Sequence, residues 1–539
     1  MKKILLLLVT LLVVTSLITL LFAGCKDEAV EEATEEEAAT EEEEMAEEEE
    51  EVAEEDEEIA IEGLPYSVPQ YPTDQEREAI LSARQIVEEM GEEVTLKLLV
   101  SPDNVSDFEP FYEEWENETG IKLETYTVPW PDWYKELSDV SITKTDKYDV
   151  FMMAPQWVPD LVEAGVLENF ATYIDEYDPE ILDPDSPNRI LTGLESFGKY
   201  KDSYYFFMSD TDVATLYLRK DWLEDPENKA AFESEYGYAL DKPNTVEEWL
   251  DQMEFFNDPE EGIYGMAASW SSEEAAFDFF PRLLSQKVAF FDDEMHPNIN
   301  SAEAVQALEE MEEMLNYSMP GTLEFDFARA LEAFAGGQVY STVLMTWAQA
   351  GFEDPEFSSV VGNVTYTPYP GRMIDGELIS PQPQYWGWGY SVSAYSNYKE
   401  LAYLYSQWMS GAAMNARVAL TPGGWYDVCK ESNYDEAQFP EIRRKNGGIY
   451  MDEWMENQQW QVEHCFPAIS MRGGAEYSGI LIEAVTGVLK GALEAEAALD
   501  EVAVKWEEIT ERYGREEQIE SWNSLKAIYS SPVQDWLGF

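Results

Sequence analysis

The stretch Tyr148–Phe170 reads YDVFMMAPQWVPDLVEAGVLENF, and its order of apolar and breaking residues decides the fold. The apolar run Val150–Met153 predicts a short buried strand. Pro155 interrupts that strand, and the spacing of the apolar residues after Trp157 predicts a helix and its exit. A strand followed directly by a helix is half of a βαβ unit, so the neighbouring segments decide what sheet it joins.

Two further strand and helix pairs precede this segment. Residues 92–101 and 121–128 read as strands, whereas Phe108–Gly120 and Pro131–Ile142 have helical spacing. Three strands alternating with three helices predict right-handed crossovers and a parallel sheet. Ligands of open parallel sheets bind beyond the carboxyl ends of the strands. Those ends carry candidate ligands for a solute: Asp103, Asn104, Trp130, Gln156 and Trp157.

A crossing into a second lobe is predicted at Ser209–Asp212, between two short strands. The second lobe has its own helices and strands, two of which end at Trp270 and Trp347, and residues 363–371 and 385–396 are predicted to return to the first lobe. The fold class is α/β, with two lobes joined by hinge crossings. The predicted boundaries are 92–212 and 363–411 for lobe 1, and 213–362 and 412–539 for lobe 2.

The N-terminus predicts export and a lipid anchor. Two lysines and about 20 apolar residues are typical of a signal peptide over residues 1–24, although a plain transmembrane anchor has a similar length. The run Leu21–Cys25 resembles a bacterial lipobox, which predicts that Cys25 is lipidated and holds the protein on the outer face of the membrane. Residues 25–91 are predicted to form a disordered acidic tether.

The composition excludes some functions. Removing the roughly 22 acidic residues and one lysine of residues 26–63 from the formal net charge of −78 leaves about −57, which excludes nucleic-acid binding. Only His296 and His464 are present, so neither a metal centre nor another cofactor is expected. Asp178, Asp183 and Asp185 could hold calcium, but their irregular spacing favours a surface loop. A P-loop is absent, so any transport ATPase is a separate chain.

Cys429 and Cys465 form the remaining pair of cysteines in an exported chain. A disulfide between them would close a loop of about 37 residues and contribute on the order of 4 kcal/mol. Two buried thiols are the alternative, and the sequence favours the disulfide.

Four segments resemble one family. They are FYEEWENETGIKLETY, YDVFMMAPQWVPDLVEAGVLENF, ALEAFAGGQVYSTVLMTWA, and GYSVSAYSNYKELAYLYSQWMSG followed by TPGGWYDVC. In order and spacing they resemble the extracellular solute-binding proteins of ABC importers, in the group that includes maltose-binding protein. The resemblance implies a monomer that closes two lobes around a carbohydrate and docks on the transmembrane subunits of a permease. It also implies that Trp347 stacks on sugar and that Gln156, Trp157, Asp103 and Asn104 contact hydroxyl groups. Tyr477 aligns near a late aromatic residue of the family.

The residue types suit a carbohydrate, and an oligosaccharide is expected. Aromatic rings cover the C–H faces of a pyranose, and polar side chains at strand ends pair with its hydroxyl groups. The candidate set adds Asp210, Asp212, Trp270, Trp386, Trp388, Trp425 and Arg472 to the residues above. Helical spacing instead predicts a core role for Trp115, Trp249, Trp408 and Trp506. A glycoside hydrolase and a surface adhesin without a transport role are the alternatives, and no enzymatic activity is expected.

Overall fold

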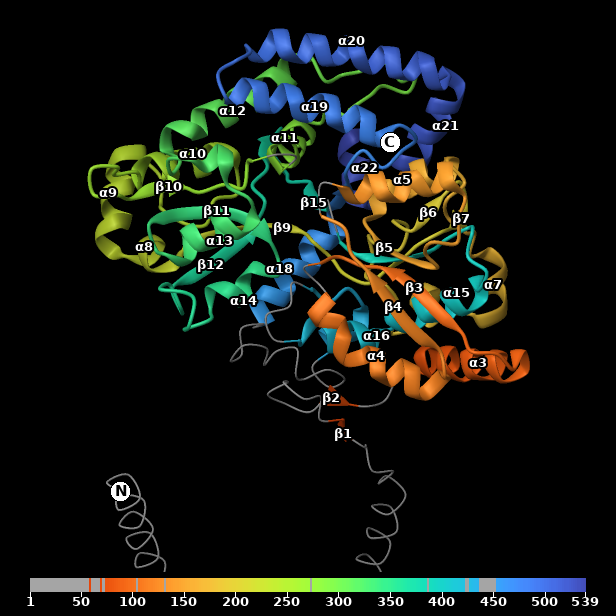
Figure 1. Cartoon of the computed structure of the whole chain (residues 1–539). Helices are drawn as coiled ribbons and strands as arrows, with labels where there is room; N and C mark the ends of the chain where they lie inside the picture. Colours follow the sequence, from red (N-terminus) through yellow and green to blue (C-terminus); the bar gives the residue numbers. More distant parts are fainter. Residues whose placement is uncertain are drawn as a thin grey trace, which may run out of the picture. The chain divides into compact units, whose positions relative to one another are not determined.

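The computed structural model describes residues 58–59, 68–69, 73–102, 105–129, 132–271, 274–384, 387–421, 426–435 and 452–539 (Figure 1). The predicted signal peptide and Cys25 lie outside these ranges. β1 (Glu58–Ile59) and β2 (Val68–Pro69) form an antiparallel pair. None of the described helices combines the length and the apolar character that crossing a membrane requires.

The first sheet confirms the three predicted strand and helix pairs. Its strands follow the order β4 (Lys122–Tyr126), β3 (Thr95–Leu99), β5 (Val150–Met153), β16 (Gly389–Val392) and β8 (Phe207–Met208). The first three strands are parallel, and β16 is antiparallel to both β5 and β8. The helices beside this sheet are α4 (Val105–Thr119), α5 (Trp133–Thr143), α6 (Val158–Glu163), α7 (Ala171–Tyr177) and α15 (Lys399–Met409).

The core of this first lobe contains two of the predicted core tryptophans. Trp115 of α4 and Trp408 of α15 are fully buried, and their ring centroids lie 5.1 Å apart. Gly120 ends α4 with φ +78°, a conformation that glycine adopts without a steric penalty. The contact between the two indole rings packs α4 against α15.

The second sheet has the order β10 (Tyr264–Met266), β11 (Val339–Met345), β9 (Ala214–Arg219) and β12 (Val364–Pro368). β9 follows β8 directly, so the chain passes from the first sheet to the second between Met208 and Ala214, where the sequence predicts the crossing at Ser209–Asp212. The prediction that residues 363–371 return to the first lobe is wrong, because β12 pairs with β9 over Val364–Pro368. The sequence of β12 predicts a strand, but the choice of β9 as its partner depends on residues that are distant in the chain.

The helices of the second lobe surround a separate core. They are α8 (Lys220–Glu224), α9 (Pro226–Tyr236), α10 (Val246–Phe255), α11 (Glu274–Leu284), α12 (Ala302–Met314), α13 (Phe327–Ala335), α14 (Ala348–Phe352), α19 (Gly474–Leu489), α20 (Ala495–Tyr513), α21 (Arg515–Lys526) and α22 (Ser531–Leu537). Figure 1 shows α19 beside α20 at the top, with α11 below α19, and α12 packs against both α19 and α20. Trp249 and Trp506 are fully buried in this core, as predicted.

The C-terminal part of the chain does not stay within one lobe. In α16 (Ala412–Ala419), Ala413 and Ala416 pack in the second core, whereas Met414 and Val418 pack in the first. After α18 (Asp452–Glu463), β17 (Cys465–Pro467) pairs with β15 (Gln382–Gln384). Residues after 411 therefore connect both cores rather than belonging to lobe 2 alone.

The predicted tether ends earlier than residue 91. α3 (Asp74–Met90) packs on α15 and α4, with Gln75, Glu76 and Ala79 buried. The Gln75 amide spans two other segments, since Nε2 donates to Gln407 O (2.8 Å) and Oε1 accepts from Ile181 N (3.0 Å). The prediction of a disordered tether is wrong for residues 73–91, because this acidic segment has one face that packs on the lobe.

The predicted disulfide is also wrong. Cys429 and Cys465 are both buried free thiols. They flank one segment of chain, since Cys429 O accepts from Leu191 N (3.0 Å) and the Cys465 sulfur contacts Gly193 O (3.8 Å). The Cys429 sulfur lies 3.0 Å from Lys430 Nζ instead.

Candidate functional site

The first sheet brings three loops to one of its ends. Gly389 of β16 lies opposite both Met153 of β5 and Met208 of β8. Residues 154–157 after β5, residues 209–212 after β8 and residues 387–388 before β16 therefore lie at the same end of the sheet. This is the carboxyl end of the parallel strands, where an α/β sheet binds its ligands.

The second sheet meets the same place through β9 and β11. Met345, the last residue of β11, lies opposite Ala214, the first residue of β9. Thr346 Oγ1 then lies 3.3 Å from Thr211 O, and Thr211 Oγ1 donates to Gln384 Oε1 (3.0 Å). The crossing between the sheets is thus fixed by side chains that come from both lobes.

We call this region the junction site. Its members are Gln156, Trp157, Asp210, Asp212, Thr346, Trp347, Gly387, Trp388 and Asp427.

Three buried carboxyl groups form the polar centre of the junction site. Asp210, Asp212 and Asp427 are 0%, 5% and 1% exposed. Asp427 N donates to Asp210 Oδ1 (2.7 Å), Gly387 N donates to Asp212 Oδ2 (3.1 Å), and Thr346 Oγ1 donates to Asp427 Oδ2. Each aspartate thus accepts at least one hydrogen bond from the chain.

Burial changes the acidity of this centre. It raises the pKa of Asp212 to about 7. The pKa of Asp210 is raised well above its usual range, first by burial and then by the charges of Asp212 and Asp427. Desolvation and nearby like charges both disfavour the ionised form of an acid. A positively charged ligand would reverse both effects.

The aromatic members of the junction site are largely covered. Trp388 is 9% exposed, and its ring centroid lies 5.8 Å from that of Trp133 at an interplanar angle of 55°. Trp347 is 6% exposed. Trp157 is half-buried, packs against both cores and lies 5.7 Å from the Tyr134 ring. Of these three rings, Trp157 has the most surface available to a solute.

Gln156 precedes Trp157 in the short helix η3 (Pro155–Trp157). Its Oε1 atom is buried and has no hydrogen-bond partner among the residues that the structure describes. A buried amide oxygen without a donor costs free energy, which a donor from a ligand would recover. Both residues of the predicted Gln156 and Trp157 pair are therefore suited to contact a solute.

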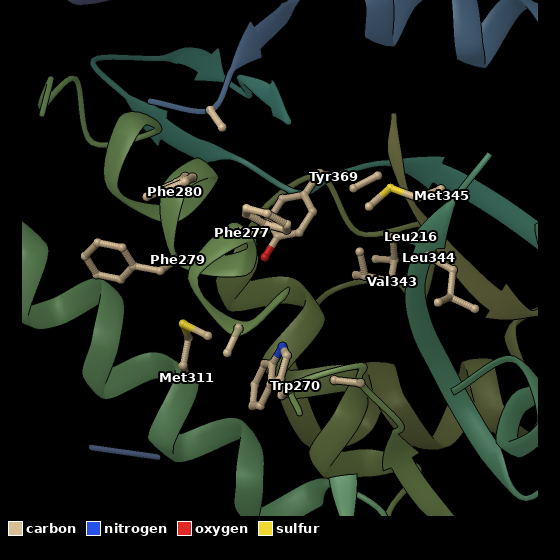
Figure 2. Close-up of a cluster of buried hydrophobic side chains, with 14 of the residues drawn as sticks. Leu216, Trp270, Phe277, Phe279, Phe280, Met311, Val343, Leu344, Met345 and Tyr369 are labelled. Carbon is tan, nitrogen blue, oxygen red and sulfur yellow. The ribbon is translucent and has the colours of Figure 1, made fainter. Parts of the chain in front are cut away.

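Two predicted ligands lie in the hydrophobic core instead. Trp270 is fully buried, and its Nε1 donates to Asp278. Figure 2 shows its ring among core side chains of the second lobe, including Phe277 and Met311. Tyr477 is also fully buried, with its hydroxyl 2.9 Å from Thr510 Oγ1. Their predicted role as solute ligands is wrong, because each side chain is already enclosed by its own lobe.

The other predicted ligands fall into two groups. Arg472 is partly exposed and lies over the Tyr513 ring, with 5.1 Å between its Cζ atom and the ring centroid. The remaining predicted ligands lie outside the described residues: Asp103, Asn104, Trp130, Trp386 and Trp425.

Sequence reasoning missed Thr346, Gly387 and Asp427. Thr346 and Gly387 each adjoin a tryptophan that the sequence predicts as a ligand, but nothing in the sequence marks these two residues themselves. Asp427 lies in the quoted segment TPGGWYDVC, but no spacing in the sequence relates it to Asp210. Only the fold brings the two together.

The fold is that of a two-lobed solute-binding protein, and the comparison with protein families agrees. Residues 101–416 match the family described as bacterial extracellular solute-binding protein. The match spans more than half of the chain, so this protein belongs to that family. The region before residue 101, which includes α3, lies outside the match.

Individual relatives are distant. The chain is 24% identical over 374 residues to the erythritol/L-threitol-binding protein of Mycolicibacterium smegmatis, which covers 63% of this chain and 71% of that protein. The fold resembles a solute-binding protein of Agrobacterium radiobacter K84 in complex with ribitol, with a TM-score of 0.63 and 23% identity over 77% of this chain and 98% of that one. It also resembles maltose-bound MalE3 of T. maritima, with a TM-score of 0.63 and 19% identity over 77% and 100%. At these identities the two structures support the fold alone.

Proposed function

We propose that this protein is the extracytoplasmic solute-binding component of an ABC importer and that it binds a carbohydrate or a polyol at the junction site. The observation that carries the proposal is the register of the two sheets, which brings loops of both lobes to one place. Hydroxylated ligands also appear in the names of the relatives, as erythritol, ribitol and maltose.

The solute contacts in this proposal are Gln156, Trp157, Trp347 and Trp388. Indole rings cover the C–H face of a sugar at low cost in entropy, and the Gln156 amide oxygen accepts from a hydroxyl group. An oligosaccharide remains the expected ligand because the aromatic residues are many. A lipid on Cys25 would keep the protein at the membrane, where it delivers the solute to the permease subunits.

Thermal unfolding with a panel of sugars and polyols tests the proposal. A ligand at a hundred times its dissociation constant contributes about 2.7 kcal/mol to stability, which raises the melting temperature measurably. Trp157→Ala should abolish the shift that the best ligand causes. Trp222→Ala is the matched control, since Trp222 is also half-buried but lies on the Arg219 side chain of the second lobe.

Two results would contradict the proposal. If no sugar or polyol raises the melting temperature while peptides do, the ligand class is wrong. Release of monosaccharides from an oligosaccharide during prolonged incubation would favour the glycoside hydrolase instead.

A further inference from the structure

The carboxyl groups of Asp210, Asp212 and Asp427 lie close enough to share one small ligand. One oxygen atom from each of them lies within 4.8 Å of those of the other two, and all three side chains are buried. Three like charges at this separation repel one another strongly, because the protein interior screens them less than water does. The centre therefore needs either protons or a positive charge.

The described chain supplies no such charge to Asp210 or Asp212. None of its lysine, arginine or histidine residues forms an ion pair with either side chain. Lys430 is buried three residues beyond Asp427, but its Nζ donates to Met208 O (2.9 Å) and lies 3.0 Å from the Cys429 sulfur. Its ammonium group is thus engaged by other atoms.

Two carboxylate oxygens also lack hydrogen-bond partners. Asp210 Oδ2 and Asp212 Oδ1 are buried, and no donor among the described residues reaches either of them. Buried polar atoms are nearly always satisfied in folded proteins, so an unsatisfied pair inside an acidic cluster indicates a ligand. A cation satisfies such oxygens directly.

We propose that Asp210, Asp212 and Asp427 bind a calcium ion at the crossing between the two sheets. Calcium takes oxygen ligands at about 2.4 Å, so two oxygens on opposite sides of the ion lie about 4.8 Å apart, whereas magnesium needs a tighter and more regular shell. Two positive charges also balance the negative charges of Asp210 and Asp212, with which no described lysine, arginine or histidine forms an ion pair. Water or hydroxyl oxygens complete the six to eight ligands that calcium prefers.

This assignment changes the role of two predicted solute ligands. Asp210 is 0% exposed, which suits an ion better than a sugar ring. The ion would join the β8–β9 crossing to the loop after α16, because Asp210 and Asp212 lie in the first and Asp427 in the second. Calcium therefore holds the junction together, while Gln156 and the tryptophans remain for the solute.

The full chain is purified with a chelator and then dialysed to remove bound metal. Calcium binding to this protein, with no sugar present, tests the proposal. Equilibrium dialysis with metal analysis should find one calcium ion per chain, and Asp212→Asn should raise the dissociation constant for calcium at least tenfold. The control is Asp185→Asn. Asp185 lies on the exposed loop that the sequence offers as the other candidate calcium site, so this variant should bind calcium as the wild type does. Comparing variants of the same chain also cancels weak binding by the acidic residues before position 73.

Terbium luminescence gives a second measurement that needs only the wild type. Tyr426 adjoins Asp427 in the sequence and interacts with the Asp210 charge, so it should sensitise a bound terbium ion that excess calcium displaces. The proposal is overturned if the wild type binds no calcium at millimolar concentration, if Asp212→Asn binds equally well, or if Asp185→Asn loses the ion. It is also overturned if glucosamine raises the melting temperature and calcium does not, since the solute would then supply the positive charge.

Discussion

Replacing Glu76 by glutamine should change how the stability of the protein depends on pH. Glu76 is fully buried at the start of α3, where Oε1 accepts from Met414 N (2.9 Å) and Oε2 accepts from Thr73 N (2.7 Å). Burial raises its pKa from the usual 4.5 to about 7, against the opposing effects of these hydrogen bonds and of the Arg417 charge. Arg417 is itself paired with Glu114.

The magnitude follows from the two pKa values. Because the folded state keeps a proton that the unfolded state releases, stability is highest below pH 4.5 and falls as the pH rises toward 7. A shift of 2.5 pKa units corresponds to about 3 kcal/mol, at 1.36 kcal/mol for each unit. Glutamine carries no charge at any pH and keeps an acceptor for Met414 N. The Glu76→Gln protein should therefore gain about 3 kcal/mol relative to the wild type between pH 4 and pH 8.

Urea unfolding of both proteins at each pH from 4 to 8 measures this difference, and comparing the two removes the contributions of the other titrating groups. Glu88→Gln, an exposed change on the same helix, serves as the control and should differ from the wild type by a constant amount. If the free-energy difference between Glu76→Gln and the wild type is equally constant across the range, the account of Glu76 is refuted.

Three further predictions concern packing. Gly411→Ala should destabilise the protein by about 2 kcal/mol in urea unfolding, because its Cβ would lie 2.1 Å from Glu76 Oε1, and an unchanged midpoint would contradict the packing of α3. Trp408→Ala should cost about 3 to 5 kcal/mol in the same assay, since it empties a fully buried site beside Trp115, whereas a loss below about 1 kcal/mol would place this ring outside the core. Cys429 and Cys465 should not react with a thiol reagent in the folded protein, and both should react after unfolding without any added reductant. Mass spectrometry measures the modification, and a need for prior reduction would show that the two cysteines form a disulfide after all.

The first lobe was predictable because its signals are local. β3, β4 and β5 are short apolar runs, and the helices between them have clear spacing and ends, such as Gly120 after α4. Each strand and helix pair could be identified from about 25 residues of sequence. The crossing after β8 was visible for the same reason, since two strands follow each other there without a helix between them.

The failures share a different cause, which is dependence on distant contacts. The face of α3 is readable in hindsight from Gln75, Ala79 and Ala83 at spacings of four residues, but the acidic composition around it favoured disorder. The strand at 364–368 was identified correctly and assigned to the wrong sheet, because pairing depends on its partner β9. Trp270 was placed at the end of a strand, but its burial depends on α11, whose Asp278 accepts from the indole.

Register explains why the junction site forms only in the folded chain. Moving β9 by one residue along β11 would exchange the two faces of the strand and carry Asp212 to a different level. Tyr217 prevents such a shift, since its buried hydroxyl donates to Thr346 O (3.0 Å) at the end of β11. Thr215 adds a second restraint through its hydrogen bond to Gln461 Oε1 (2.9 Å). The positions of Asp210 and Asp212 are thus set by residues three to seven places further along the chain, whose partners lie more than 100 residues away. The sequence of the crossing names these two aspartates as candidates, but no pattern within it shows that Asp427 lies beside them.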